Sequence, residues 1–244
     1  MSFSLTSTYR CFNGTRMKVL LTSLLVLLTL PSTAQRHWVG VVGGVHRTNA
    51  TTGSFTGGTD AEYRGLGGGT YEYFLSEHVS IGADLLYALR GFADSFGSQA
   101  APEERRMLYY HYDYLALPLK VGLTDFREAA LGFKVAGFAK LGLVPSWLIR
   151  AETELPPLVI GGDPAPARVV DVTDRVSPFD VAGMVEVGVG GNVLAGLWWT
   201  ISATYQHSLT SISNDNYFSG ISMRHNSVGL MVGLKQQINV DSDW

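Results

Sequence analysis

Apolar and polar residues alternate along most of this chain. In residues 79–90 the odd positions carry Val, Ile, Ala, Leu, Tyr and Leu, whereas the even positions carry Ser, Gly, Asp, Leu, Ala and Arg. Successive side chains of a β-strand point to opposite faces of the sheet. The spacing therefore predicts a strand with one apolar face and one mostly polar or small face, and helical periodicity fits poorly.

The same alternation recurs and predicts about eight strands. They lie near residues 37–47, 66–76, 78–91, 107–123, 130–144, 179–191, 197–210 and 225–238. Single-chain barrels of bacterial outer membranes have an even number of strands. Pro118 falls inside the fourth predicted strand, and because proline has no N–H to donate to a ladder, we expect a local kink there.

The predicted connections alternate between long and short. The long, polar ones are 48–65, 92–106, 145–178 and 211–224, and the short ones are at Glu77, 124–129 and 192–196. Outer-membrane barrels have long extracellular loops and short periplasmic turns. A soluble β-sandwich also alternates along its strands, but it has no reason to sort its loops by length. The pattern thus predicts an all-β, eight-stranded antiparallel up-and-down transmembrane β-barrel.

The start of the chain predicts export. Residues 17–35 read MKVLLTSLLVLLTLPSTAQ, with a basic start, an apolar run and then small residues up to Ala34. This is the order of a secretory signal peptide, and the run is short for a spanning helix, which needs about 20 residues. We expect cleavage near Ala34, with an uncleaved anchor as the alternative. Residues 1–16 do not fit a signal and are expected to be a mis-annotated extension, which leaves 36–244 as the barrel domain.

Composition agrees with a wall that faces lipid. Charged residues make up 16% of the chain, against roughly 25% in soluble proteins. The formal net charge of −3 gives no sign of a nucleic-acid-binding surface. The only cysteine, Cys11, precedes the predicted cleavage site, which excludes disulfides, cysteine catalysis and cysteine-bound zinc from the exported part.

Residues 114–120 carry a local motif. They read Tyr-Leu-Ala-Leu-Pro-Leu-Lys and resemble the tyrosine–leucine–x–hydrophobic–proline–leucine segment of the PorT-like outer-membrane β-barrel proteins of Bacteroidetes. The Ala34-Gln35 end of the signal and the final strand at 229–235 are similar to the same group. The resemblance implies an outer-membrane barrel of about eight strands, and it implies no single activity.

Strand parity assigns a set of charged side chains to the barrel interior. A barrel of about eight strands is just wide enough inside for side chains to fill it. An unpaired buried charge is costly, so acids and bases there should pair in a structural network. A narrow ion path or a small binding site is the functional alternative. The residues predicted to form this network are Glu72, Asp84, Arg90, Lys120, Lys134, Lys140, Glu186 and Lys235.

Aromatic residues fall near the ends of the predicted strands. Interfacial girdles of a membrane barrel look like this, although aromatic packing is common in any sheet. The residues are Trp38, Tyr71, Tyr73, Tyr109, Tyr110, Tyr112, Tyr114, Trp147, Trp198, Trp199, Tyr217 and Trp244.

The chain offers only weak candidates for catalysis. The run at 206–208, Gln-His-Ser, invites comparison with lipid A deacylases, which use a His-x-Ser arrangement with an acid. Here adjacent residues point to opposite faces of a strand, whereas triad chemistry needs hydrogen-bond contact. The scattered histidines lack metal-ligand spacing, so we expect a surface or interface role for them. The acids in or beside the third loop are expected to be solvated, with cation binding as the alternative. These residues are His78, His111, His225, Glu152, Glu154, Asp171, Asp174 and Asp180.

These observations predict a small outer-membrane barrel without enzymatic activity, with no catalytic residue, cofactor or metal. We expect it to act through its extracellular loops, chiefly 145–178 and 92–106, in binding, adhesion or envelope structure. One alternative is a component of a secretion or transport complex, as the PorT resemblance allows, and another is a lipid-modifying enzyme. The expected partners are outer-membrane lipid and other envelope proteins, with no nucleic acid, and we expect a monomer.

Overall fold

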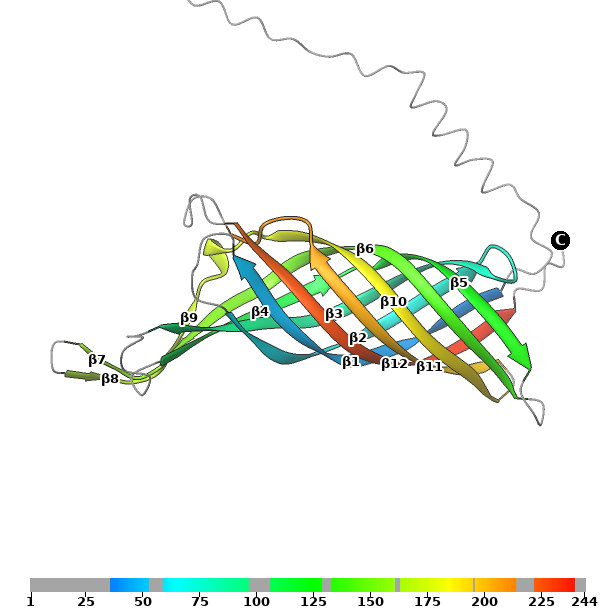
Figure 1. The fold of residues 1–244 in the computed structure, drawn as a ribbon, viewed down its shortest axis with the longest axis horizontal. Coiled ribbons are helices and arrows are strands. Elements are labelled where there is room, and N and C mark those ends of the chain that lie inside the picture. Colours follow the sequence, from blue (N-terminus) through cyan, green and yellow to red (C-terminus); the bar gives the residue numbers. More distant parts are fainter. Residues whose placement is uncertain are drawn as a thin grey trace, which may run out of the picture. The chain divides into compact units, whose positions relative to one another are not determined.

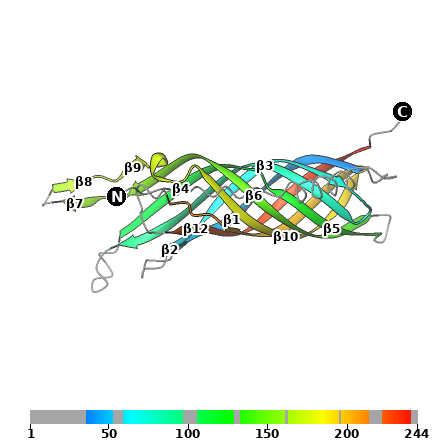
Figure 2. The ribbon, with the colours of Figure 1, turned by 90° about the horizontal axis from the view of Figure 1, so that it is seen from above.

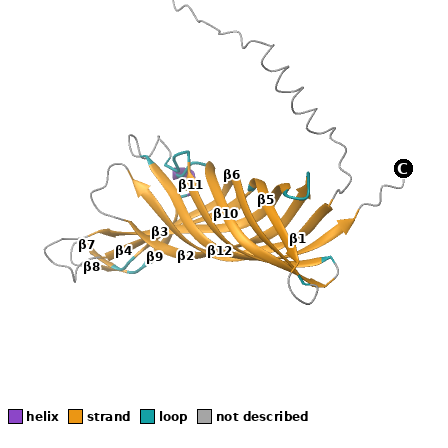
Figure 3. Cartoon of the chain, turned by 45° about the vertical axis from the view of Figure 1, so that its right-hand side comes forward, coloured by secondary structure: helices purple, strands orange, loops and turns teal. Residues whose placement is uncertain are grey.

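A computed structural model describes residues 36–52, 59–96, 106–128, 133–160, 163–194, 196–213 and 222–239. They belong to the unit Ala34–Trp244, and the chain's other unit is Met1–Thr33. The predictions for the extension at 1–16 and the signal at 17–35 lie outside the described residues. Nearly all described residues are in strands (Figure 3). This part of the chain contains no helix that is long and apolar enough to cross a bilayer.

Antiparallel strands of this unit close into a ring (Figure 1). Its wall is built by β1 (Arg36–Thr52), β2 (Thr59–Phe74), β3 (Val79–Phe96), β4 (Arg106–Ala116) with β5 (Leu119–Glu128), β6 (Lys134–Leu155), β10 (Phe179–Leu194), β11 (Leu197–Ser208) and β12 (Met223–Asn239). Each wall position pairs with the next, and β1 pairs with β12 over its whole length, from Arg36 to Thr52. With β4 and β5 counted as one position, the ring has eight, which confirms the predicted fold class.

The kink predicted at Pro118 is present. β4 ends at Ala116 and β5 begins at Leu119, so the fourth wall position is interrupted at the two residues between them. Proline has no N–H to continue the ladder. The neighbouring strands satisfy the exposed backbone groups instead, because Asp84 N donates to the Pro118 carbonyl at 3.0 Å and Leu117 N donates to the Pro145 carbonyl at 2.9 Å.

The alternation sorts the side chains onto the two faces of the wall. On β12 the outward residues are exposed and apolar, and the inward ones are buried and mostly polar or small. Asn226 and Gln236 bound the outward apolar run, which spans residues 227–235. A membrane-crossing strand needs about 9–11 residues, so this band matches the hydrocarbon layer. The outward residues are Val228, Leu230, Val232 and Leu234. The inward residues are Ser227, Gly229, Met231, Gly233 and Lys235.

The two ends of the ring differ. The short-turn end carries the tight β2–β3 connection at 75–78 and the β10–β11 connection, in which Gly196 has a φ of 79°. That left-handed conformation favours glycine, because other residues meet a steric penalty there. The opposite end, called here the long-loop end, carries the connections that the sequence predicts to be long.

At the long-loop end one side of the wall continues as a projecting sheet, defined here as residues 106–113 of β4, residues 150–155 of β6, and β9 (Arg168–Asp171). β9 pairs with the end of β6. A hairpin of β7 (Leu158–Ile160) and β8 (Asp163–Ala165) lies at the far tip (Figures 1 and 2). The prediction of one long loop over 145–178 is therefore wrong for 145–155. β4 offers a ladder to this segment, so its backbone groups are satisfied in a sheet rather than by water.

Candidate functional site

The barrel interior begins, at the short-turn end, with a layer of aromatic rings. Trp38 and Trp198 are buried and stack with their ring centroids 5.0 Å apart. Phe74 lies 5.1 Å from Trp38, and Phe126 meets Trp198 edge-on at 5.6 Å. The two tryptophans are thus lumen residues and not part of an outer girdle, because strand parity turns them inward.

Next to the aromatic layer lies a layer of paired charges, and Glu72 is its most connected carboxylate. Lys140 Nζ donates to Glu72 Oε1 at 2.6 Å, and Lys235 Nζ donates to Glu72 Oε2 at 2.8 Å. The Ser80 hydroxyl donates to Oε1 at 2.7 Å. Each of these four side chains is buried and comes from a different strand, so the contacts tie distant parts of the wall together.

Lys120 joins the other two carboxylates of the same layer. Its Nζ donates to Asp84 Oδ2 at 2.6 Å and to Glu186 Oε2 at 3.2 Å. The Thr70 hydroxyl donates to the remaining oxygen of Asp84 at 2.7 Å. Glu72, Asp84 and Glu186 therefore balance Lys120, Lys140 and Lys235, and the layer is electrically neutral.

A glycine makes room for this layer. Gly122 faces the lumen, where a Cβ would lie 2.9 Å from Lys140 Cγ and 3.0 Å from Ser80 Oγ. Only a residue without a side chain lets Lys140 extend past this point of the wall. Two of the eight predicted members lie outside this layer. Lys134 is exposed at the short-turn end, because β6 begins at this residue, and Arg90 pairs with Asp180 in a second cluster described below.

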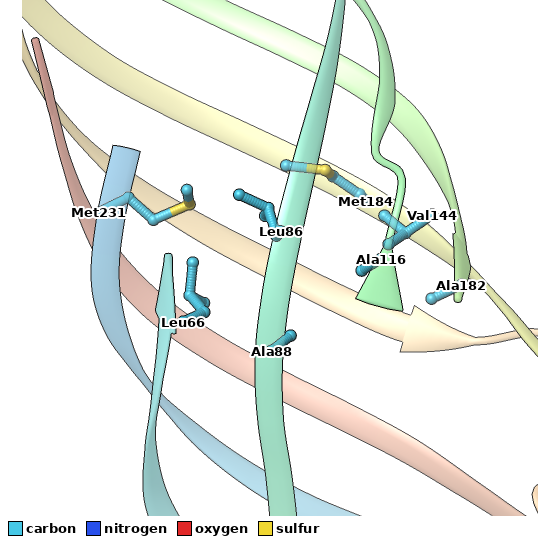
Figure 4. Packing of buried hydrophobic residues seen from close by; sticks show 8 residues of the cluster. All are labelled: Leu66, Leu86, Ala88, Ala116, Val144, Ala182, Met184 and Met231. Carbon is cyan, nitrogen blue, oxygen red and sulfur yellow. The ribbon is translucent and has the colours of Figure 1, made fainter. Parts of the chain in front are cut away.

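An apolar layer follows the charges toward the long-loop end. Figure 4 shows Leu66, Leu86, Met184 and Met231 reaching from four strands into the same part of the lumen. The smaller residues Ala88, Ala116, Val144 and Ala182 complete this layer. Its close packing separates the paired charges from the long-loop end of the barrel.

A second polar cluster lies beyond the apolar layer. Arg90 donates to Asp180 Oδ2 at 2.8 Å and to the Ser146 hydroxyl at 3.3 Å. Asp180 also accepts from Ser208 at 2.8 Å and from Thr210 at 2.8 Å. The expectation of a solvated loop residue at Asp180 is wrong, because its side chain is fully buried. Its parity, the same as that of Glu186 in the same strand, is a sequence signal that could have found it.

Two histidines are also buried in the lumen. His46 Nε2 donates to the Leu89 carbonyl at 2.6 Å. The His225 ring meets Tyr112 and Tyr114 edge-on, with centroids 5.2 Å and 6.1 Å away. A surface role for His225 is therefore wrong, and Tyr112 and Tyr114 are lumen residues rather than part of a girdle.

His207 and Ser208 do not form a catalytic pair. Ser208 is buried and donates to Asp180, whereas His207 lies on the opposite face of the same strand. Within the described ranges, no group of three or more His, Cys, Asp or Glu side chains could hold a metal ion. In the third loop, hydrogen bonds from Thr173 lower the pKa of the exposed Asp171 carboxyl. Glu152 forms an ion pair with Arg150.

Among the described residues, two larger cavities lie at the ends of the barrel. Beside Glu72 and Lys140 the cavity is about 10 Å³, room for roughly one water molecule. A cavity of about 490 Å³ opens at the short-turn end, over Trp38 and Trp198. Another of about 680 Å³ lies against the projecting sheet and is lined by Arg150, Asp171 and neighbouring residues. The cavity beside the paired charges is thus too small for an organic substrate, while open surface is present at both ends of the described barrel.

Comparison with known proteins gives one family match. The family described as "outer membrane protein beta-barrel domain" matches residues 32–214. No curated protein shows significant sequence similarity to the chain.

Solved structures are similar at low identity. OprG from Pseudomonas aeruginosa is 10% identical with a TM-score of 0.46, covering 86% of this chain and 98% of that one. Ail, the attachment invasion locus protein of Yersinia pestis, is 11% identical with a TM-score of 0.39, covering 82% and 98%. The outer membrane protease OmpT from Escherichia coli is 10% identical with a TM-score of 0.37, covering 87% and 100%.

Proposed function

The chain belongs to the outer membrane protein beta-barrel domain family, and we propose that it is a monomeric barrel without enzymatic activity that binds its partner through the long-loop end. In such barrels the long loops face outside and the short turns face the periplasm. The projecting sheet is then extracellular. The proposal includes binding, adhesion or an envelope-structural contact as the task of that surface.

The observation that carries the proposal is the filled interior. The paired charges and the apolar layer leave about 10 Å³ beside Glu72, which supports a structural role for the network and argues against a channel or an internal active site. The separation of His207 from Ser208 argues against acyl-transfer chemistry. What remains for function is the external surface, where scaffold-borne loops commonly carry binding.

The projecting sheet supports a binding role for that surface. Ladder hydrogen bonds between β4, β6 and β9 fix the backbone of this sheet beyond the membrane band, so a partner meets a preorganised surface. Arg150, Glu152 and Asp171 place charges of both signs on it next to the exposed apolar Ile149 and Val169. Mixed polar and apolar surface of this kind is typical of protein-binding regions.

The test compares two variants in lipid nanodiscs. In the first, a Gly-Ser linker replaces residues 150–171, which carry the β6 and β9 parts of the projecting sheet and the β7–β8 hairpin. In the second, Leu replaces Glu72, Asp84 and Glu186 and Met replaces Lys120, Lys140 and Lys235, so that the charge layer stays neutral. Both are probed against a glycan array and against solubilised envelope proteins. We expect the first variant to lose binding and the second to keep it, and both to give no ion conductance in planar bilayers. Binding that survives the linker but is lost with the interior substitutions would refute the proposal.

A second candidate is a PorT-like component of a secretion or transport complex. The motif at residues 114–120 favours it, and in the structure this motif spans the break in the wall at Pro118. Such a component should remain bound to other envelope proteins after gentle detergent extraction. Co-purification that depends on Pro118, and disappears in Pro118→Ala, would support this candidate over free surface binding.

A further inference from the structure

The outer face of the wall carries a cation where the membrane band ends toward the long-loop end. On β1 the outward apolar run reaches Val45, and the next outward residue is the exposed Arg47. Arg47 lies opposite Val228 of the band on β12 and opposite Tyr63 on β2, and Tyr205 of β11 pairs with Val228 from the other side. The two tyrosines are 77% and 49% exposed. Outward tyrosines are typical of the level at which hydrocarbon meets the polar headgroups, so Arg47 lies at that level.

The same strands stay polar beyond this row. Arg224 of β12 is exposed and lies opposite Thr51 of β1. Between the two arginines, Asn226 Nδ2 donates to the Thr51 hydroxyl at 2.9 Å. Within the described residues neither Arg47 nor Arg224 forms an ion pair. The outward residues here are called the rim patch, and none of them is acidic: Arg47, Asn49, Thr51, His207, Arg224 and Asn226.

The wall on the side of β4 and β6 has a different charge pattern at this end. Asp113 accepts a hydrogen bond from the Tyr87 hydroxyl at 2.7 Å and lies opposite Arg150. Arg150 forms an ion pair with Glu152. Carboxylates of the chain thus accompany the cation on that side, whereas an anion for the rim patch has to come from its surroundings.

The level of the rim patch fits the headgroup of a lipid. Arginine binds phosphate through a planar fork of N–H donors, and cations near a membrane surface attract anionic lipids. Residues 47 and 51 are about 13 Å apart along β1 at the usual rise per residue. A disaccharide with a phosphate at each end has a comparable length, whereas a single phosphate ion is too small to span it. Exposed Val45 and Val228 continue below the patch as a surface for acyl chains.

We propose that the rim patch binds a phosphorylated glycolipid of the outer leaflet, with Arg47 and Arg224 on its phosphates and its acyl chains along Val45 and Val228. The long-loop end faces outside in such barrels, which places the patch in that leaflet. The site lies on other strands than the projecting sheet, so it adds a lipid ligand to the surface binding proposed above.

The test titrates the purified protein in a neutral detergent with bisphosphorylated lipid A or with its dephosphorylated form, and native mass spectrometry counts the bound lipid. Each cation near an anionic lipid contributes roughly fivefold to binding. We therefore expect the natural chain to bind the phosphorylated form about 25-fold more tightly. Arg47→Gln with Arg224→Gln should abolish that preference. Equal binding of the two lipids by the natural chain, or an unchanged preference in the double variant, would overturn the proposal.

The matched control is Arg168→Gln. Arg168 is also exposed at the long-loop end, but it lies on β9 in the projecting sheet, beyond the membrane band. This variant should keep the preference for the phosphorylated lipid, and its loss would show a general charge effect instead of a site. A large excess of inorganic phosphate should leave the lipid bound, because the acyl chains contribute to binding. Displacement by phosphate would identify a soluble anion as the ligand and overturn the proposal.

Discussion

The paired-charge layer makes a sharp prediction about Glu72. Substitution of Glu72 by Gln keeps the shape of the side chain but removes one charge, so Lys140 and Lys235 lose the carboxylate that lies 2.6 Å and 2.8 Å from them. At an effective dielectric constant near 20, each contact corresponds to a Coulomb attraction of about 6 kcal/mol. Desolvation of the three groups offsets most of it.

The net loss is expected to be about 3–5 kcal/mol in the free energy of unfolding, the range for breaking a buried ion pair by removing one partner. Urea titration of the barrel refolded in detergent or lipid measures it. The matched control is Asp125→Asn, which removes a carboxylate from an ion pair 2.8 Å long whose side chains are 78% and 56% exposed. Exposed pairs contribute at most about 1 kcal/mol.

The joint replacement of all six charged residues of the layer separates charge imbalance from packing, with Leu in place of Glu72, Asp84 and Glu186 and Met in place of Lys120, Lys140 and Lys235. With no charge left unpaired, this variant should be as stable as the natural chain or more stable, by up to about 4 kcal/mol. If Glu72→Gln lowers the free energy of unfolding by less than about 1 kcal/mol, or by no more than Asp125→Asn does, the paired charges do not stabilise the barrel as described.

Three further predictions concern the other layers. Leu86→Ala opens the apolar layer and should lower the free energy of unfolding by about 2–5 kcal/mol in the same titration; a loss below about 1 kcal/mol would contradict the packing described. Val232→Arg places a charge on the membrane band and should lower the free energy of unfolding by about 2–4 kcal/mol, whereas Thr51→Arg, exposed beyond the band, should lower it by less than about 1 kcal/mol. Equal losses would show that the membrane band does not lie where the structure places it. Because the pKa of Asp171 is lowered in the folded chain, its hydrogen bond from Thr173 N is present above the ordinary value of 3.8 and is lost as the pH falls through the lowered pKa. The Thr173 amide resonance should shift across that window, and an unchanged resonance would exclude the bond.

The alternation of residues along each strand predicted most of the charged side chains that face the lumen. Glu72, Lys120 and Lys140 alternate with outward apolar neighbours, so their inward direction follows from a period of two. Asp180 lies at the start of the predicted strand 179–191 and shares the inward parity of Glu186. Its place beside the long third loop led to the wrong expectation that it is solvated. Lys134 was included because parity gives a direction and says nothing about how far along the barrel a residue lies.

The partners within the lumen needed the tertiary structure. Glu72 and Lys235 are 163 positions apart in the chain, and only the pairing of β1 with β12 closes the ring that brings them together. The same holds for Arg90 and Asp180, which meet across the lumen. Register and shear decide such contacts, and neither is encoded in the local alternation.

The sequence by itself determined that the chain forms a closed barrel with a lipid-facing exterior, because alternation and loop length are local properties that every strand repeats. Only the tertiary structure decided that the interior is a stack of aromatic, charged and apolar layers, and that the wall extends beyond the membrane band into a sheet. Those features depend on strand pairing and register, which place each residue at a given level along the barrel axis. Pairing and register are fixed by the packing of the whole ring and not by any one strand.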